Sequence, residues 1–196
     1  MKVKVTKLTG IEEAKEFITA SLHDHKESSI KNLKKLYLSE HSPMYTQVFK
    51  INMYDIPSYV STHFRTHKKN FLAETVTTNR SDRGGDENAG RNTPVDMIIY
   101  CNAKTLVDMS LKRLCTHADS IAREVMEMIK EEVKLVDEDL YRFMVPQCIY
   151  RCGLCQEWKS CGKVKTEKFR YELKEYLKGF ERSEERRVGK ECRSRW

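Results

Sequence analysis

The sequence lacks any long run of apolar residues. None approaches the roughly eighteen residues that a membrane-spanning helix needs, and the N-terminus has no apolar stretch of the kind found in a secretory signal peptide. We therefore expect a soluble, cytoplasmic protein with no membrane partner. The chain of 196 residues is long enough for a proper hydrophobic core, and its length predicts a single domain.

The sequence also lacks a strong excess of positive charge when residues 182–196 are left out of the count. The formal net charge is +7, but residues 182–196 hold six basic and three acidic residues, and the remainder has an ordinary +4. This tail has no apolar periodicity, and residues 182–192 match without a mismatch the in-frame translation of a common sequencing-adapter string. We expect residues 182–196 to be non-native, and a basic tail that binds nucleic acid is the weaker explanation.

The strongest pattern follows the apolar run at residues 97–100. Apolar residues recur there every three to five positions, which predicts one long, half-buried helix from about Thr105 to Val133. Asn102 precedes this helix and can cap its first turn. Helical geometry then puts Arg113 and His117 on the same face as Asn102. A cation and an imidazole on a core helix need a partner, so this face is a candidate functional site.

Residues 102–119, NAKTLVDMSLKRLCTHAD, resemble a segment of the flavin-dependent thymidylate synthases (ThyX), N-A-R-S-L-x-N-x-L-x-L-R followed by H-A-Q. In that family the Asn, the first Arg and the second Asn contact FAD, and the last Arg holds the uracil of dUMP. The resemblance implies FAD-binding roles for Asn102, Lys104 and Asp108, and a uracil-binding, catalytic role for Arg113. Two positions depart from the pattern: Lys104 lacks the planar fork of arginine, and Asp108 replaces an amide by an anion.

Other stretches carry the same resemblance more weakly. The order helix, H-S-P, strand, proline, helix is similar to the ThyX order, and it implies that Ser42 contacts FAD. The family signature RHRxxSxNExSxRY has its RHR triplet at residues 66–68. Further implied FAD contacts are His67, Lys68 and Glu74, and implied dUMP contacts are His63, Thr78, Arg80 and Arg83. We expect Arg and hydroxyl donors to suit a phosphate, and we expect His67 and Lys68 to stabilise the reduced, anionic flavin as cations. These basic residues also suit an exposed helix face.

Residues 80–94 are rich in Gly, Asp and Asn without periodicity, which predicts a loop. ThyX proteins usually have a longer, partly helical insertion here that brings another dUMP-binding arginine. Arg83 and Arg91 are the possible substitutes in this chain. The short loop therefore bears on the identity of the substrate more than on the use of a flavin.

The cysteines after the central helix are closely spaced. Cys148, Cys152, Cys155 and Cys161 give C-x3-C-x2-C-x5-C. Such a cluster in a reducing compartment more often binds metal than forms disulfides, and zinc tolerates short loops. We predict a structural zinc site, with reduced, partly buried thiols as the alternative. A radical-SAM cluster also has the C-x3-C-x2-C spacing but normally lies in a much larger barrel. The stretch also resembles the C-terminal end of some phage-type ThyX relatives.

The resemblance implies an α/β domain over residues 1–163, with a mixed sheet flanked by helices and a long central helix. An amphipathic helix is predicted over residues 166–180, in a C-terminal segment 164–181. The implied reaction is reductive methylation of dUMP to dTMP with FAD, NADPH and methylenetetrahydrofolate, in a homotetramer with shared active sites. The alternatives are a diverged flavoenzyme for another pyrimidine nucleotide, and a non-enzymatic zinc protein that binds nucleic acid. The latter would use Lys68, Lys69, Arg80 and Arg83.

Overall fold

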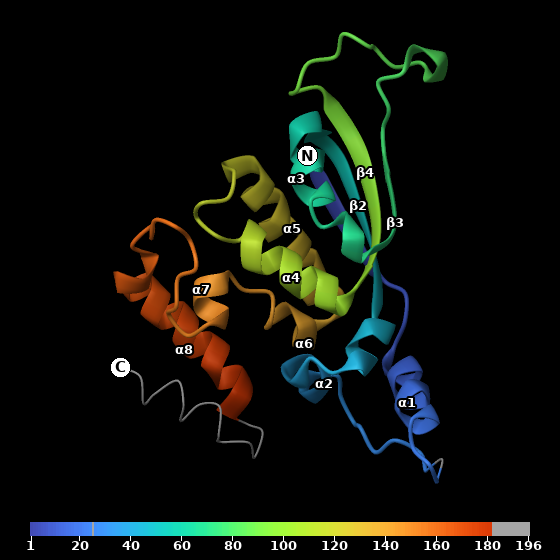
Figure 1. Cartoon of the computed structure of the whole chain (residues 1–196), viewed down its shortest axis with the longest axis vertical. Helices are drawn as coiled ribbons and strands as arrows, with labels where there is room; N and C mark the ends of the chain where they lie inside the picture. Colours follow the sequence, from blue (N-terminus) through green and yellow to red (C-terminus); the bar gives the residue numbers. More distant parts are fainter. Residues whose placement is uncertain (25, 182–196) are drawn as a thin grey trace.

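The computed structural model describes residues 1–24 and 26–181 (Figure 1). One sheet contains β1 (Lys2–Lys7), β2 (Val48–Pro57), β3 (Phe71–Val76) and β4 (Pro94–Asn102) in the order β1-β2-β4-β3. All three neighbouring pairs are antiparallel, which corrects the expected mixed sheet. The strand β3 does run in the same direction as β2, because a helix carries the chain back along the sheet. However, β4 lies between these two strands and pairs with both.

Beside the strands, the described residues form eight α-helices and four short 3-10 segments. The helices are α1 (Ile11–Ala20), α2 (Lys34–Ser39), α3 (Ser58–Arg65), α4 (Ala103–Arg113), α5 (Ser120–Val136), α6 (Glu138–Tyr141), α7 (Gln147–Tyr150) and α8 (Glu167–Glu181). The 3-10 segments are η1 (Ser42–Thr46), η2 (Lys68–Asn70), η3 (Ser81–Arg83) and η4 (Lys163–Lys165). The fold is thus a mixed α/β fold, and α8 is the predicted C-terminal helix. In the described part of the chain, no helix is long and apolar enough to cross a membrane.

The helices α3, α4 and α5 lie together on one face of the sheet (Figure 1). Side chains of a strand alternate between faces, and every second residue of β4, from Val95 to Cys101, is buried. The core between sheet and helices also contains Phe49, Ile51 and Met53 of β2 and Val125, Met126, Ile129 and Val133 of α5. This packing places the start of α4 at the end of the sheet where β4 finishes.

The predicted single helix over residues 105–133 is wrong, because the structure has two helices there. The first, α4, ends at Arg113, and α5 begins after Asp119. The Asp119 side chain accepts hydrogen bonds from the backbone N–H groups of Ile121 and Ala122 at 3.1 and 3.0 Å. An aspartate at this position is typical of the start of a new helix. The apolar stripe continues through both helices, so the periodicity does not mark the break between them.

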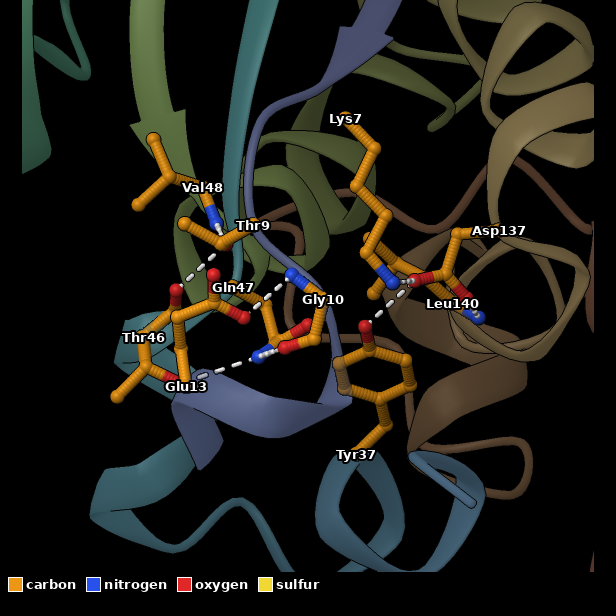
Figure 2. A network of polar contacts seen from close by, with 10 residues as sticks. All are labelled: Lys7, Thr9, Gly10, Glu13, Tyr37, Thr46, Gln47, Val48, Asp137 and Leu140. Carbon is orange, nitrogen blue, oxygen red and sulfur yellow. Dashed lines mark hydrogen bonds and ion pairs between the residues drawn. The ribbon is translucent and has the colours of Figure 1, made fainter. Parts of the chain in front are cut away.

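A buried carboxylate fixes the N-terminal strand to the helices (Figure 2). Asp137 follows α5, and one of its oxygens accepts from the Tyr37 hydroxyl and from Lys7 Nζ, both at 2.6 Å. The other oxygen accepts from the backbone N–H of Leu140 at 2.9 Å. A buried charge needs such partners to offset its loss of hydration. The network therefore connects β1, α2 and α6 through one buried carboxylate.

The predicted non-native tail, residues 182–196, lies outside the described residues.

Candidate functional site

The start of α4 is built as the sequence predicts. The Asn102 side-chain oxygen accepts a hydrogen bond from the backbone N–H of Thr105 at 2.9 Å. The Thr105 hydroxyl lies 3.0 Å from the same oxygen and donates to the backbone carbonyl of Asn70 at 2.9 Å. Asn102 is held in place by the turn that it caps, and η2 is attached to that turn.

Arg113 lies at the other end of α4, about 16 Å from Asn102 along the helix axis. Its half-buried side chain contacts the segment after α3. Nη2 donates to the Thr66 hydroxyl at 2.6 Å, and Nε donates to Nε2 of His67 at 3.3 Å. The expected partner of this cation is therefore a hydroxyl and an imidazole. Burial lowers the pKa of Arg113, but a guanidinium stays protonated in proteins.

His67 is neutral in this arrangement, which corrects its expected role as a cation near a flavin. Burial and then the neighbouring Arg113 lower its pKa from 6.5 to about 4. Since Nε2 accepts from the guanidinium, the proton of the neutral ring is on Nδ1. The imidazole orients Arg113 and adds no charge of its own at neutral pH.

Lys104, one of the residues expected to bind FAD, lies between two carboxylates. Lys104 contacts the Asp108 carboxylate one turn further along α4, and its Nζ lies 3.3 Å from Glu40 Oε2. Burial alone would lower the pKa of Lys104, but the two carboxylates outweigh burial and raise it. The lysine charge is thus already balanced by two acidic side chains. Asn102 is partly buried two residues before Lys104, whereas Ser42 is exposed in η1.

Sequence patterns did not identify Glu40 and Tyr150 as members of this cluster. Glu40 ends α2 in a left-handed conformation, with φ of 50°, and it accepts from the Tyr150 hydroxyl of α7. Burial and then Glu40 raise the pKa of Tyr150. A glutamate and a tyrosine 110 positions apart carry no spacing signal, so only the folded chain brings them together.

Glu74 forms a second cluster with two cations. Its Oε1 lies 3.1 Å from Arg65 Nε and 3.4 Å from Lys68 Nζ, and its side chain is only 12% exposed. Its Oε2 is buried and makes no hydrogen bond to the described residues. A concavity of about 360 Å³ between α3 and β3 opens beside Glu74 and Arg65 and extends to Thr78. Lys68 is exposed, and its charge is shared with this carboxylate.

The loop between β3 and β4 holds Thr78, Arg80 and Arg83, which were expected to bind the phosphate of dUMP. Arg80 makes two hydrogen bonds with Asp82, Nε to Oδ1 at 2.8 Å and Nη2 to Oδ2 at 2.6 Å. Thr78 accepts from the Arg80 backbone N–H at 3.3 Å, and Arg83 is exposed in η3. This loop lies at the end of the sheet opposite the start of α4 (Figure 1). One copy of the chain therefore does not bring Arg80 and Arg113 to the same end of the sheet.

His63 lies on α3 with its ring against Tyr59, at 6.0 Å between ring centroids. The guanidinium of Arg91 lies over the same tyrosine ring at 4.6 Å. His63 therefore belongs to an aromatic and cationic cluster on α3, whereas His67 belongs to the Arg113 contact. Thr66, which contacts Arg113, was missed as a site residue although it stands at the first position of the expected RHR triplet.

The cysteine segment packs beside the end of α4. A small cavity of about 20 Å³ lies there, lined by Cys115, Thr116, His117, Pro146, Gln147, Cys148, Cys155, Gln156, Glu157, Ser160, Cys161, Lys163 and Val164. The cysteines of the described residues form no disulfide. Within residues 1–24 and 26–181, no group of three or more His, Cys, Asp or Glu side chains is placed to hold one metal ion.

Two expectations for this region are corrected. His117 does not share a helical face with Asn102 and Arg113, because α4 ends before it, and it lines the cysteine cavity instead. Cys152 is not among the residues that line the cavity. It follows α7 with φ of 51°, and this left-handed conformation turns the chain away after Cys148.

The local environment distinguishes two of the cavity thiols. Burial raises the pKa of the Cys148 thiol above its usual value; the charge of Lys163 opposes this, and Cys115 adds to it. The pKa of the Cys161 thiol is lowered, first because the Thr116 hydroxyl hydrogen-bonds to it and then because the Lys163 backbone N–H does. The loop after α4 and the segment around Cys161 are thus in direct contact.

Comparison with solved structures shows which fold this is. The chain is similar to the flavin-dependent thymidylate synthase ThyX of Helicobacter pylori in complex with FAD and dUMP, with a TM-score of 0.58 and 9% sequence identity over 74% of this chain and 100% of that one. A second structure of ThyX from the same organism with FAD and dUMP gives 0.55 and 11% over 72% and 99%. No model of a known protein family and no curated protein matches the sequence. The fold is therefore ThyX-like.

Proposed function

We propose that this protein is a flavin-dependent thymidylate synthase that converts dUMP to dTMP, with methylenetetrahydrofolate as carbon donor and NADPH as reductant. The observation that supports this most is the placement of Arg113. It lies at the end of the helix that begins at Asn102, it is half-buried, and it is oriented by Thr66 and His67. A guanidinium held in this way can donate two parallel hydrogen bonds to a uracil ring.

The residues near the start of α4 fit FAD in part. Bound FAD would supply the hydride for the reductive methylation. Asn102 and the exposed Ser42 offer polar contacts without a competing ion pair among the described residues. Lys104 is the cation available to a flavin diphosphate, and it would share its charge between that group and the carboxylates of Asp108 and Glu40. His67 would contribute a neutral hydrogen-bonding ring.

We infer that the nucleotide site is shared between copies of the chain. Arg113 would hold the uracil of dUMP, while Thr78, Arg80 and Arg83 from another copy would hold its phosphate. Two observations support this: these groups lie at opposite ends of the sheet in one chain, and Arg80 is exposed with only Asp82 as its ion-pair partner among the described residues. The ThyX-like fold makes a homotetramer the expected assembly.

The sharpest test of the enzyme is conversion of dUMP by the full chain. We expect protein reconstituted with FAD to absorb as a flavoprotein and to release dTMP when methylenetetrahydrofolate and NADPH are present, as measured by liquid chromatography. Arg113→Ala should abolish product. Arg142→Ala is the matched control, because Arg142 is exposed directly after α6 and pairs with Glu138. A colourless protein that ignores added FAD would contradict the proposal.

Complementation tests the shared site. Arg113→Ala and Arg80→Ala, each inactive alone, should regain activity when they are refolded together, since about a quarter of randomly paired sites would carry both arginines. A mixture as inactive as its components would show that both arginines serve the same copy, or that only one of them binds the nucleotide.

A second candidate is a flavoenzyme of this fold that acts on another pyrimidine nucleotide. It is favoured by the loop after β3, where Arg80 is paired locally and the long insertion of ThyX proteins is absent. The nucleotide that slows oxidation of the reduced flavin by air, dUMP or dCMP, would distinguish the two. A nucleic-acid-binding protein is less favoured, because Lys68 and Arg80 are paired with Glu74 and Asp82.

A further inference from the structure

The cavity beside the end of α4 has room for one atom-sized occupant. Its volume is about 20 Å³, whereas a cavity needs about 10–15 Å³ to hold a single water molecule. No nucleotide or organic cofactor fits such a space. Any specific ligand here must be a water molecule or a single ion.

The lining of the cavity is rich in thiols. Cys115 comes from the loop after α4, Cys148 from α7, and Cys155 and Cys161 from the segment that leads to η4. The four cysteines that line this cavity offer the donor set of a closed, tetrahedral zinc site, and soft sulfur ligands select zinc over magnesium or calcium.

The sulfur of Cys161 already has two hydrogen-bond partners. Gly162 has φ of +78°, and the turn that it makes lets the backbone N–H of Lys163 donate to Cys161 Sγ at 3.4 Å. The Thr116 hydroxyl, from the opposite side of the cavity, hydrogen-bonds to the same sulfur. Bonds of this kind fix the direction of a metal ligand and are the usual outer shell of a thiolate site.

We propose that Cys115, Cys148, Cys155 and Cys161 bind one structural Zn²⁺ ion in this cavity, with Cys115 in the place that sequence spacing assigns to Cys152. No group of three or more such side chains is placed to hold a metal ion in the described residues, so binding requires the thiols to move together. Cys155 and Cys161 are exposed on a segment without an α-helix or strand, and they can make that movement. Metal binding and local folding are coupled in such sites.

The site would join two parts of the chain that are separated in sequence by α5 and α6. The loop that carries Cys115 begins directly after Arg113, whereas Cys148 lies in α7, and Cys155 and Cys161 lie between α7 and η4. A zinc ion bound by both would fix the end of α4 against the C-terminal segment. This role is separate from the proposed flavin chemistry, so either can fail without the other.

Metal content of the full, reduced chain tests the proposal. We expect about one zinc per chain by elemental mass spectrometry after dialysis against Zn²⁺ and removal of weakly bound metal. Cys115→Ala and Cys155→Ala should each weaken zinc binding by more than about 100-fold, since loss of a mere outer-shell partner already costs 10- to 100-fold. Cys115→His, which restores a zinc ligand, should recover binding.

Two matched controls test whether zinc binding depends on cysteines outside the proposed set, one in the C-x3-C-x2-C-x5-C motif and one in residues 182–196. Cys152→Ala and Cys192→Ala should both keep one zinc per chain. Loss of zinc from Cys152→Ala with retention in Cys115→Ala would overturn the proposed ligand set and restore the C-x3-C-x2-C-x5-C set. A reduced wild-type chain that binds no zinc would overturn the site itself, as would peptide mapping that finds these cysteines joined in disulfides in the purified protein. If Cys115→Ala does not fold, loss of zinc from the exposed Cys155→Ala together with its retention in Cys152→Ala would support the proposed set, and loss from both would overturn it.

Discussion

The two ends of the sheet hold their polar side chains in different ways. On the helix that follows β4, Arg113 is held by Thr66 and His67, which are 47 and 46 positions away. At the other end, in the loop between β3 and β4, Arg80 is held by Asp82, two positions away. Side chains held by distant contacts are oriented before a ligand arrives, whereas a local pair on an exposed loop leaves the orientation to the partner. The comparison teaches that only the first end is a preorganised half-site.

The largest expected effect comes from changing the arginine of the preorganised end. Arg113→Lys should weaken dUMP binding by about 10- to 100-fold, because one point charge cannot reproduce two hydrogen bonds from a planar group. Calorimetric titration with dUMP would measure this. Arg142→Lys makes the same change in an exposed pair and should bind dUMP as the wild type does. Equal affinities of Arg113→Lys and wild type would remove Arg113 from the site.

The next effect concerns His67 and acid. Its pKa is about 4 in the folded protein, against 6.5 ordinarily. Between these values the unfolded chain binds a proton that the folded chain excludes, so stability should fall as the pH drops from about 6.5 to about 4 and level off below. Because the ring is only partly shielded, we expect a loss of about 1–2 kcal/mol.

Urea unfolding of wild type and His67→Gln across this pH range would isolate that contribution. The variant should lack the part of the pH dependence that His67 supplies. Parallel curves for the two proteins would mean that the imidazole titrates normally in the folded state, and that its contact with Arg113 is not maintained.

A smaller effect is expected from the cap that starts α4. Asn102→Ala removes the acceptor for the Thr105 N–H and should lower the free energy of unfolding by about 1 kcal/mol, the usual cost of losing such a cap. Asn102→Asp keeps an acceptor and should recover most of the stability. Unfolding in urea measures both, and an alanine variant as stable as wild type would exclude the cap as a stabilising contact.

The smallest effect is expected at the opposite end of the sheet. Arg80→Gln breaks only an exposed pair with Asp82, and such pairs contribute about 0.2–1 kcal/mol at most. Thermal unfolding should therefore hardly change, while mixing with Arg113→Ala should restore activity if Arg80 serves the site of another copy. A marked loss of stability would show that the loop is held more firmly than its contacts indicate.

Local patterns were sufficient for the elements nearest the site. The β4 to α4 transition, the Asn102 cap and the C-terminal helix follow from an apolar run, helical periodicity and one capping side chain. The break between α4 and α5 was missed because both helices bury the same apolar stripe, and periodicity alone does not register the cap at Asp119. The antiparallel sheet was missed because β4 lies between β2 and β3, and the pairing of distant strands does not follow from the pattern within each strand.

The sequence by itself determined that a cation would lie at one end of a core helix and that cysteines would gather near the C-terminus, because both follow from neighbours along the chain. Only the tertiary structure decided their partners. Thr66 and a neutral His67 hold Arg113, Glu40 reaches Lys104 from another helix, and Cys115 rather than Cys152 lines the thiol cavity. The physical reason is that burial and contacts between distant segments set charge state and orientation, and neither is encoded in local spacing.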